Sequence, residues 1–237
     1  MREDDPRFKI AAARRILARE GCESAVAGHV SMRAAGEDAF WVTPFEYFDE
    51  TTPDRVIKVS MEGRLLEGDY EPSPAVEFHA AFYKARPDVN SVIHTHSHYA
   101  MVFSTTRRVI GQYNVGSVLF YDEQALYEDD GETPAVDGPV MADLLGVDKS
   151  VVLIKNHGAV IVAESLETCT VMSFMLEKCA QYHIEAEAIG GTEFPEKEVL
   201  RGKDAYHKYF LPNMWEANYR RLRKSDPDLF AYVNGRS

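Results

Sequence analysis

The most informative part of the sequence is SVIHTHSH, residues 91–98. Its apolar start predicts a short buried strand over residues 91–95, and alternate residues of a strand point to one face. His94 and His96 would therefore lie side by side, roughly 7 Å apart along the strand, where two imidazoles can share one metal ion. The other interpretation of this stretch is a pair of histidines exposed where a strand leaves the sheet.

A second apolar strand ends in another histidine. Residues 151–158 read VVLIKNHG, in which the apolar run predicts a buried strand and Asn-His-Gly predicts a sharp turn. Such a turn can direct the imidazole of His157 inward, toward the first two histidines. His157 would otherwise be a turn residue that bonds only to the backbone. With three imidazoles available, the preferred hypothesis is a site for one divalent transition-metal ion.

The remaining helical and terminal histidines are weaker candidates. His98 is a candidate to contact the ligands rather than the metal itself. Ser97 is typical of a helix N-cap, and a helix there would turn His98 away from the strand face. His79 falls on the apolar face of a predicted helix, where a hydrogen-bonded core histidine is the more common case. His183 and His207 have polar surroundings and are predicted to be surface residues.

The flanking sequence predicts a single α/β domain over residues 1–237. Helical periodicity predicts helices over residues 8–20, 74–85, 99–104, 140–145 and 166–188. β-Rich segments bounded by turn residues predict further strands over residues 28–33, 40–43, 55–60, 115–121 and 159–162. The acidic stretch 122–138 predicts a long loop over a site. From about residue 200, aromatic and basic residues predict a helical docking arm.

Composition limits the partners and the compartment. The formal net charge is −12, from 38 acidic and 26 basic residues, so the average field repels nucleic acid and anionic membranes. The three cysteines have no C-x-x-C spacing, and their odd number favours a reducing compartment. The N-terminus is charged, unlike a secretory signal, and no apolar run is long enough for a membrane span. A cytoplasmic protein with a small-molecule substrate is expected.

The order of several short motifs carries a family resemblance. Along the chain these motifs are GHVSMR at 28–33, FWVTP at 40–44, ARPDV at 85–89, HTH at 94–96 and NHG at 156–158. In combination they resemble the class II aldolase/adducin family over about residues 8–190. The resemblance implies a three-layer α/β/α fold around a mainly antiparallel sheet, in homotetramers with active sites between subunits. It also implies that His94, His96 and His157 bind the metal.

Two departures from the family pattern limit what can be transferred. Ala75 stands where the sugar-phosphate aldolases of the family carry a catalytic glutamate, and Glu77, half a turn further on, is expected to point elsewhere. The phosphate-binding motifs are altered too, with Gly28-His29 in place of Gly-Asn, Phe45-Glu46 in place of Ser-Gly, and Pro74 in place of a serine. Because the Glu46 carboxylate would repel a phosphate, a non-phosphorylated substrate is expected.

These features favour a metal-dependent carbon–carbon lyase, either a decarboxylase or an aldolase, that acts on a non-phosphorylated hydroxy or oxo acid. The motifs are more similar to an adducin-like branch that includes decarboxylases of hydroxylated aromatic acids, and the aromatic residues Phe40, Trp41, Phe45 and Tyr47 fit such a substrate. Zinc is the expected ion, with iron, manganese or cobalt as alternatives, because three neutral imidazoles suit each of them and leave positions open for substrate.

Three residues are assigned to the substrate. His29 and Arg33, on an early strand, are candidates to bind its carboxylate, although Arg33 could equally form a surface salt bridge. Tyr121 is the candidate proton donor or else a tyrosine at the edge of the core. Two other functions remain open: a non-haem Fe(II) oxygenase that uses the same three histidines, and a non-catalytic adducin-like interaction module, which predicts the loss of a histidine ligand.

Overall fold

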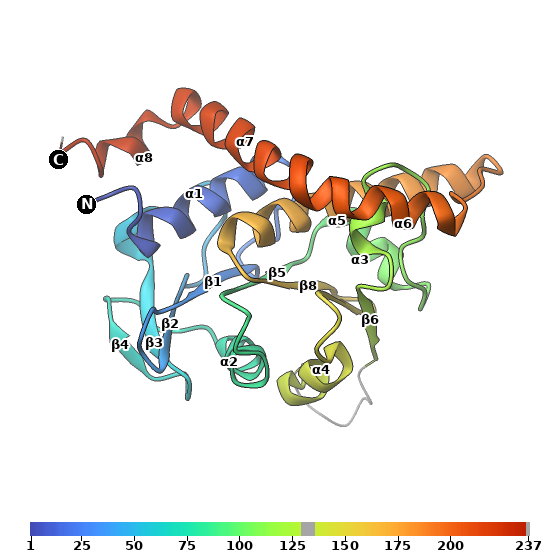
Figure 1. The fold of residues 1–237 in the computed structure, drawn as a ribbon. Coiled ribbons are helices and arrows are strands. Elements are labelled where there is room, and N and C mark those ends of the chain that lie inside the picture. The colour runs from blue at the N-terminus through green and yellow to red at the C-terminus, as the bar shows by residue number, and fades with distance from the viewer. Residues whose placement is uncertain (129–135, 236–237) are drawn as a thin grey trace.

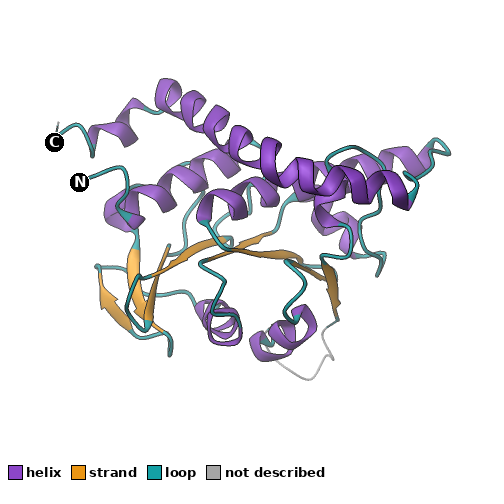
Figure 2. Cartoon of the chain, in the orientation of Figure 1, coloured by secondary structure: helices purple, strands orange, loops and turns teal. Residues whose placement is uncertain are grey.

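The computed structural model describes residues 1–128 and 136–235. An eight-stranded sheet runs through the described part of the chain in the order β4-β3-β2-β1-β5-β8-β7-β6. Neighbouring strands are antiparallel except for β6 and β7, which are parallel. Helices cover both faces of the sheet (Figures 1 and 2). The predicted three-layer α/β/α fold with a mainly antiparallel sheet is confirmed.

The strands are short, and most of them are buried. They are β1 (His29–Arg33), β2 (Ala39–Val42), β3 (Ile57–Ser60), β4 (Leu65–Glu67), β5 (Ser91–Thr95), β6 (Gln124–Tyr127), β7 (Val151–Ile154) and β8 (Gly158–Ala163). The bounds of β5 and β7 match the predictions to the residue. Both strands have helices over both of their faces, which explains why every residue of each is buried.

Two sets of helices form the outer layers (Figure 1). One face carries α1 (Pro6–Arg19), α3 (His98–Ser104), α5 (Leu166–Ala188) and the C-terminal helices α6 (Glu196–Ala205), α7 (Leu211–Ser225) and α8 (Pro227–Ala231). The other face carries α2 (Val76–Ala85) and α4 (Gly138–Leu145). Each layer buries its own apolar cluster against the sheet. Side chains cap the first turns of α1 and α5, where Asp5 accepts from Arg7 N and Ser165 accepts from Thr168 N.

Two predicted elements are wrong. Residues 115–121 do not form a strand, because Val118, Leu119 and Phe120 are buried on the 3-10 turn Ser117–Phe120. The segment predicted as a long loop over residues 122–138 contains β6, which extends the sheet by pairing with β7. The part of that predicted loop over residues 129–135 lies outside the described residues.

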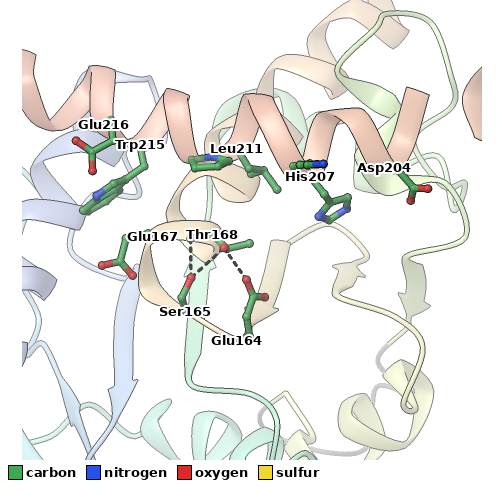
Figure 3. Close-up of a pocket in the computed structure, with 11 residues that line it drawn as sticks. Glu164, Ser165, Glu167, Thr168, Asp204, His207, Leu211, Trp215 and Glu216 are labelled. Atoms are coloured by element: carbon green, nitrogen blue, oxygen red, sulfur yellow. Dashed lines mark hydrogen bonds between the residues drawn. The ribbon is translucent and has the colours of Figure 1, made fainter. Parts of the chain in front are cut away.

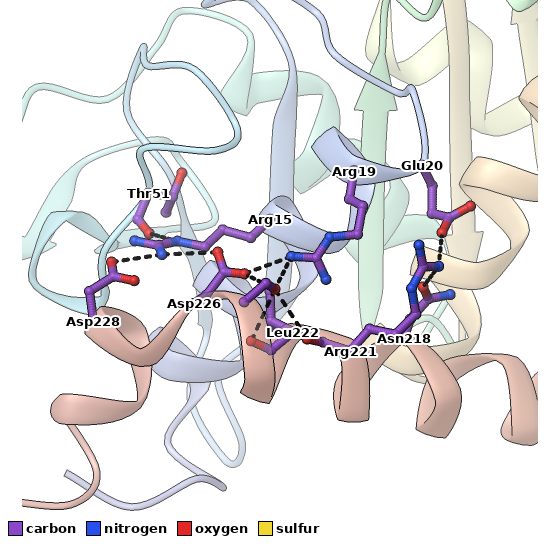
Figure 4. A network of polar contacts seen from close by, with 10 residues as sticks. Arg15, Arg19, Glu20, Thr51, Asn218, Arg221, Leu222, Asp226 and Asp228 are labelled. Atoms are coloured by element: carbon purple, nitrogen blue, oxygen red, sulfur yellow. Dashed lines mark hydrogen bonds and ion pairs between the residues drawn. The ribbon is translucent and has the colours of Figure 1, made fainter.

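The C-terminal helices lie across α1 and α5, and ion pairs hold their far end (Figure 4). The Asp226 carboxylate lies 3.2 Å from Arg15 Nη1 and 2.6 Å from Arg19 Nη2, and Asp228 lies 2.7 Å from Arg15 Nη1. Arg15 is buried, so this contact is screened less than a surface pair. None of the helices within the two described ranges is both long enough and apolar enough to cross a membrane.

Candidate metal centre

Three imidazoles meet where β5 ends and β8 begins. One possible ligand atom from each of His94, His96 and His157 lies within 4.8 Å of the other two. The Nε2 atoms of His94 and His96 are 2.8 Å apart. The ring centroid of His157 lies 4.6 Å from that of His96 and 5.2 Å from that of His94. The fold thus brings together the three residues that the sequence predicts as ligands.

The turn between β7 and β8 explains how His157 reaches the other two. Asn156 has a φ of 57°, a left-handed conformation that asparagine tolerates better than most residues. Gly158 has a φ of 147°, and a Cβ atom there would lie 2.2 Å from the carbonyl oxygen of Thr95. The turn can therefore approach the end of β5 only with glycine at this position, and that approach sets His157 opposite His96.

Hydrogen bonding and burial prepare the three rings as ligands. Nδ1 of His94 donates to the carbonyl oxygen of Ala159 at 2.9 Å, so that in the neutral ring Nε2 carries the lone pair. Burial, with the neighbouring His96 and His157, holds the pKa of His94 well below its ordinary value. Burial and then His157 lower the pKa of His96 to about 4, and burial lowers the pKa of His157. The rings are thus neutral at neutral pH, the form that binds a metal.

The donor set fits a divalent transition metal. Two nitrogens bonded to one ion at 2.0 to 2.1 Å with a tetrahedral angle would be about 3.3 Å apart. The three ligand atoms lie within 4.8 Å of one another, and the 2.8 Å between the Nε2 atoms of His94 and His96 is shorter than that value. A lone pair so near a second ring nitrogen is favourable only with a proton or a cation between them. Three neutral imidazoles suit zinc and Fe(II) alike.

A pocket of about 310 Å³ opens beside the three histidines. Its wall is largely apolar and includes Phe45, Pro74, Ala75, Phe78 and Val136. Among the described residues that line it, none is a lysine or an arginine. The described lining therefore offers an anion no cationic side chain from this chain, and the volume suits a small molecule.

His29 lies in this pocket beside His94. It is 1% exposed, and its ring stacks on that of His94 with centroids 6.4 Å apart and planes 13° from parallel. Burial, followed by the nearby His79 and Arg14, lowers its pKa well below the ordinary value. Neither ring nitrogen has a hydrogen-bond partner among the described residues. A buried unpaired polar group costs about 1–3 kcal/mol, so the two nitrogens of His29, whose ring lines the pocket, lack a partner that the described residues do not supply.

Two other predicted site residues do not line the pocket of their own chain. Arg33 turns toward the end of α2, where its Nε donates to Val89 O at 3.0 Å and its Nη2 to Tyr83 O at 2.8 Å. These bonds give Arg33 a structural role within its own chain. The Tyr121 hydroxyl donates to Glu196 Oε1 at 2.7 Å, away from the histidines. One chain therefore contributes His29 to the pocket, but neither Arg33 nor Tyr121.

Two carboxylates lie differently from the prediction. Glu46, expected to repel phosphate, is 1% exposed and pairs with Arg55, outside the pocket lining. Its charge is neutralised there, so it does not explain a preference for non-phosphorylated substrates. Glu77, expected to point elsewhere, is exposed at the edge of the pocket and lines it.

The structure also shows which of the other histidines and nearby aromatic residues are buried, exposed or part of the pocket wall. His183, predicted at the surface, is buried, and its Nδ1 accepts the backbone N–H of Gly111 at 2.8 Å. His98 is exposed at the start of α3 and does not line the pocket, whereas His79 is a buried core residue as predicted. Of the four aromatic residues suggested for substrate, Phe45 lines the pocket and Phe40, Trp41 and Tyr47 do not.

Glu177, which the sequence analysis did not predict as a site residue, supports the segment that carries His96. Glu177 is 5% exposed on α5, and its two carboxylate oxygens accept the backbone N–H groups of Tyr99 and Ala100, each at 2.8 Å. These bonds hold the first turn of α3 and with it the segment that carries His96. The available signal was an acidic residue within the apolar part of a long buried helix, where a charge needs a partner.

A larger cavity, of about 740 Å³, lies between the start of α5 and the C-terminal helices (Figure 3). His207, predicted to be a surface residue, is exposed at its wall. The hydroxyl groups of Ser165 and Thr168 bond to each other at 2.9 Å, and Thr168 also donates to Glu164 at 2.7 Å. These wall groups already bond to one another. Although this cavity is larger, it is therefore a weaker candidate for a substrate site than the pocket beside the three histidines.

Comparisons with known proteins agree with the fold. The family model for the Class II Aldolase and Adducin N-terminal domain matches residues 8–184. The chain is 31% identical over 234 residues to the 4-hydroxy-3-prenylphenylpyruvate oxygenase/4-hydroxy-3-prenylbenzoate synthase of Streptomyces roseochromogenus, covering 95% of this chain and 84% of the relative. It is 29% identical over 232 residues to Decarboxylase NovR of Streptomyces niveus, covering 94% and 86%.

Solved structures give the same result. L-fuculose 1-phosphate aldolase from Glaciozyma antarctica superposes with a TM-score of 0.82 at 27% identity, covering 93% of this chain and 90% of that chain. These three relatives are named for an oxygenase, a decarboxylase and an aldolase. What they share with this chain is the fold and the family. The chain belongs to the class II aldolase and adducin family.

Proposed function

We propose that this chain is a metal-dependent carbon–carbon lyase that removes CO₂ from a non-phosphorylated hydroxy or oxo acid, with aromatic acids as the preferred class. One observation carries the proposal: three neutral imidazoles border an apolar pocket whose described lining contains no lysine or arginine. A divalent ion held by His94, His96 and His157, with zinc as the first choice, would act as a Lewis acid for the electron pair that the broken bond releases.

The pocket walls suit a flat substrate. Phe45 lies edge-on to His29 with ring centroids 6.0 Å apart, and Phe78 lies edge-on to His94 at 5.3 Å. A ring between these walls would be removed from water, and an apolar environment disfavours a carboxylate relative to neutral CO₂. His29 would hold an oxygen of the substrate through one of its ring nitrogens.

The nearest alternative is an aldolase that acts on the same kind of substrate. Retro-aldol cleavage needs a base, and Ala75 supplies none at the position where related aldolases carry glutamate. Glu77 is the carboxylate at the pocket edge. Glu77→Gln separates the two reactions, because it should leave decarboxylation within about threefold of wild type and lower base-dependent cleavage by about 10²-fold or more.

The proposal includes a homotetramer with sites between subunits, in the cytoplasm. The hydroxyl of Tyr121 lies on the side of its own chain that carries Glu196, and no tyrosine lines the pocket within the described residues. Tyr121 from a neighbouring subunit would then donate the proton to the carbanion. The family resemblance supports a homotetramer with sites between subunits. Such a shared site would give a role to Tyr121, which does not line the pocket of its own chain.

A second candidate is a non-haem Fe(II) oxygenase. The observation that favours it is the 31% identity to a relative named as an oxygenase, over 95% of this chain. The same three imidazoles would bind Fe(II) and leave positions for a substrate and O₂. The pocket would then serve a hydroxy acid that is cleaved by oxidation.

One experiment separates these functions. Zinc-loaded and Fe(II)-loaded protein are incubated under nitrogen and in air with hydroxybenzoates, 2-hydroxy and 2-oxo acids and a sugar phosphate. CO₂, aldehydes and O₂ consumption are measured, and His157→Ala is the control. CO₂ from an acid under nitrogen, lost in the variant, supports the lyase. Product formed only with iron and O₂ supports the oxygenase, and cleavage confined to the sugar phosphate contradicts both.

A further inference from the structure

The backbone of His96 is held differently from that of the other two proposed ligands. His94 lies within β5, which pairs with β1 on one side and with β8 on the other. The N–H of His157 donates to Ile154 O at 3.1 Å within its turn. His96 comes directly after the last residue of β5, and its N–H donates to the hydroxyl oxygen of Ser24 at 2.7 Å. A side chain from another segment therefore holds the main chain at this ligand.

The Ser24 hydroxyl is buried and has a partner for its own hydrogen. Ser24 lies between α1 and β1 and is 4% exposed. Its hydroxyl donates to Cys22 O at 3.3 Å, which leaves a lone pair of the oxygen free to accept the N–H of His96. The backbone N–H groups of Ser24 and Phe48 both donate to Glu23 Oε1, each at 3.3 Å. The segment that presents the hydroxyl is thus tied to its neighbours on both sides.

The same segment is tightly packed and holds one residue in an unfavourable conformation. A Cβ atom at Gly28 would lie 2.5 Å from the ring of Phe48, so the two approach closely. Ala25 has a φ of 48°, a left-handed conformation that is unfavourable for alanine and persists only where surrounding contacts fix the backbone. The N–H of Ala27 donates to Ser24 O at 3.1 Å, and Ala27 lines the pocket. One rigid segment therefore contributes to the pocket wall and also contacts the backbone of His96.

We propose that Ser24 is a positioning residue of the metal centre, which holds the backbone of His96 so that its ring faces His94 before a metal binds. The Nε2 atoms of these two rings are 2.8 Å apart, although β5 ends at Thr95. Without the Ser24 hydroxyl, the main chain at His96 would be freer to rotate, and metal binding would have to order it. The inference deepens the proposed function and rests on its metal site, but not on the reaction.

Zinc affinity separates positioning from a general structural role. The dissociation constant for zinc, measured by competition with a chromophoric chelator, should rise about tenfold in Ser24→Ala. Ser24→Thr keeps the hydroxyl and should restore the wild-type affinity. Ser60→Ala is the matched control, because Ser60 is buried and its hydroxyl accepts the backbone N–H of Glu62 at 3.1 Å, away from the pocket wall. It should lower the unfolding free energy as Ser24→Ala does and leave the zinc dissociation constant unchanged.

Amide hydrogen exchange in metal-free protein gives a second readout. The amide of His96 should exchange about tenfold faster in Ser24→Ala than in wild type, while that of His94, within β5, keeps its rate. Ser24→Cys, whose sulfur is a weak acceptor, should show the same changes and replaces Ser24→Ala if that variant does not fold.

An unchanged zinc affinity or an unchanged exchange rate of His96, in whichever of these two variants folds, would overturn the inference. Absence of zinc binding by the wild-type protein would contradict the proposed function as well. Zinc binding that depends on Ser24, without any lyase activity, would contradict the proposed function alone.

Discussion

Nδ1 of His94 donates a 2.9 Å hydrogen bond to the backbone carbonyl of Ala159, which belongs to the neighbouring strand of the sheet. The pairing of β5 with β8 therefore fixes the tautomer of His94, one of the proposed metal ligands. In the same pairing Thr95 lies opposite Ala159, next to the turn that carries His157. The geometry of the centre is therefore set by rigid strands, the kind of support that keeps ligands in place before a metal binds.

The histidine pKa values predict a pH dependence of stability in metal-free protein. The folded-state pKa of His96 is about 4, below its ordinary 6.5, so the unfolded chain binds protons more readily between these values. Stability is therefore fully present above about pH 6.5 and falls as the pH drops toward 4. Urea unfolding at pH 7.5, 6 and 5 measures the slope. In His96→Gln the unfolding free energy should depend less steeply on pH. Identical slopes in the two proteins would show that the pKa of His96 is not lowered by folding.

Complementation between inactive variants tests whether sites are shared. Tyr121→Phe should lower turnover by about 10²-fold or more if its hydroxyl supplies a proton, and His157→Ala should be inactive. Hybrids assembled from equal amounts of both variants would contain some sites with intact His157 from one subunit and intact Tyr121 from another. Random assembly predicts about one quarter of wild-type activity. Hybrids no more active than the separate variants would place Tyr121 outside the site.

Arg33 is predicted to matter for stability and little for substrate. Arg33→Lys removes the fork that donates to Val89 O and Tyr83 O and should cost about 1–3 kcal/mol of unfolding free energy, while KM changes less than about twofold. Arg64→Lys is the control, since Arg64 is exposed and lies 3.8 Å from Glu62. A large rise in KM at unchanged stability would restore Arg33 as a carboxylate ligand.

Gly158 is predicted to be indispensable for the metal centre. In Gly158→Ala the new methyl group meets the Thr95 carbonyl, so we expect more than about 1 kcal/mol of lost stability and weaker metal binding. Gly146→Ala is matched to it, because Gly146 also has a positive φ, 61°, but no atom within 4 Å of a Cβ. That variant should bind metal as wild type does. Equal effects of the two substitutions would mean that φ alone, and not the contact with β5, matters.

The sequence predicted the parts of the fold and site that depend on local pattern. β5 and β7 are apolar on both faces, and His94, His96 and His157 follow directly from the ends of buried strands. The apolar residues Val118, Leu119 and Phe120 were predicted to lie in a strand, yet they are buried on a turn, and periodicity cannot separate a short buried strand from a buried turn. β6 was missed because its four residues include one exposed apolar side chain and a polar one.

The side chains whose surroundings the sequence did not predict depend on distant partners. Arg33 shares a strand face with His29, but the end of α2 meets it there with backbone carbonyls. Glu46 directly follows Phe45, which lines the pocket, yet its direction is set by Arg55 on another segment. The buried contact between His29 and His79 joins β1 to α2, and no spacing in the chain reveals it.

Metal content and turnover, measured together, test most directly whether His94, His96 and His157 hold a catalytic metal ion. Chelator-treated wild-type protein is titrated with zinc by calorimetry, and CO₂ release from hydroxy acids under nitrogen is followed at each addition; His94→Ala is treated in the same way. We expect one ion per chain and activity that rises in proportion to bound zinc in the wild-type protein, and neither zinc binding nor activity in His94→Ala. Full turnover by metal-free protein, or zinc binding that survives in His94→Ala, would contradict this expectation.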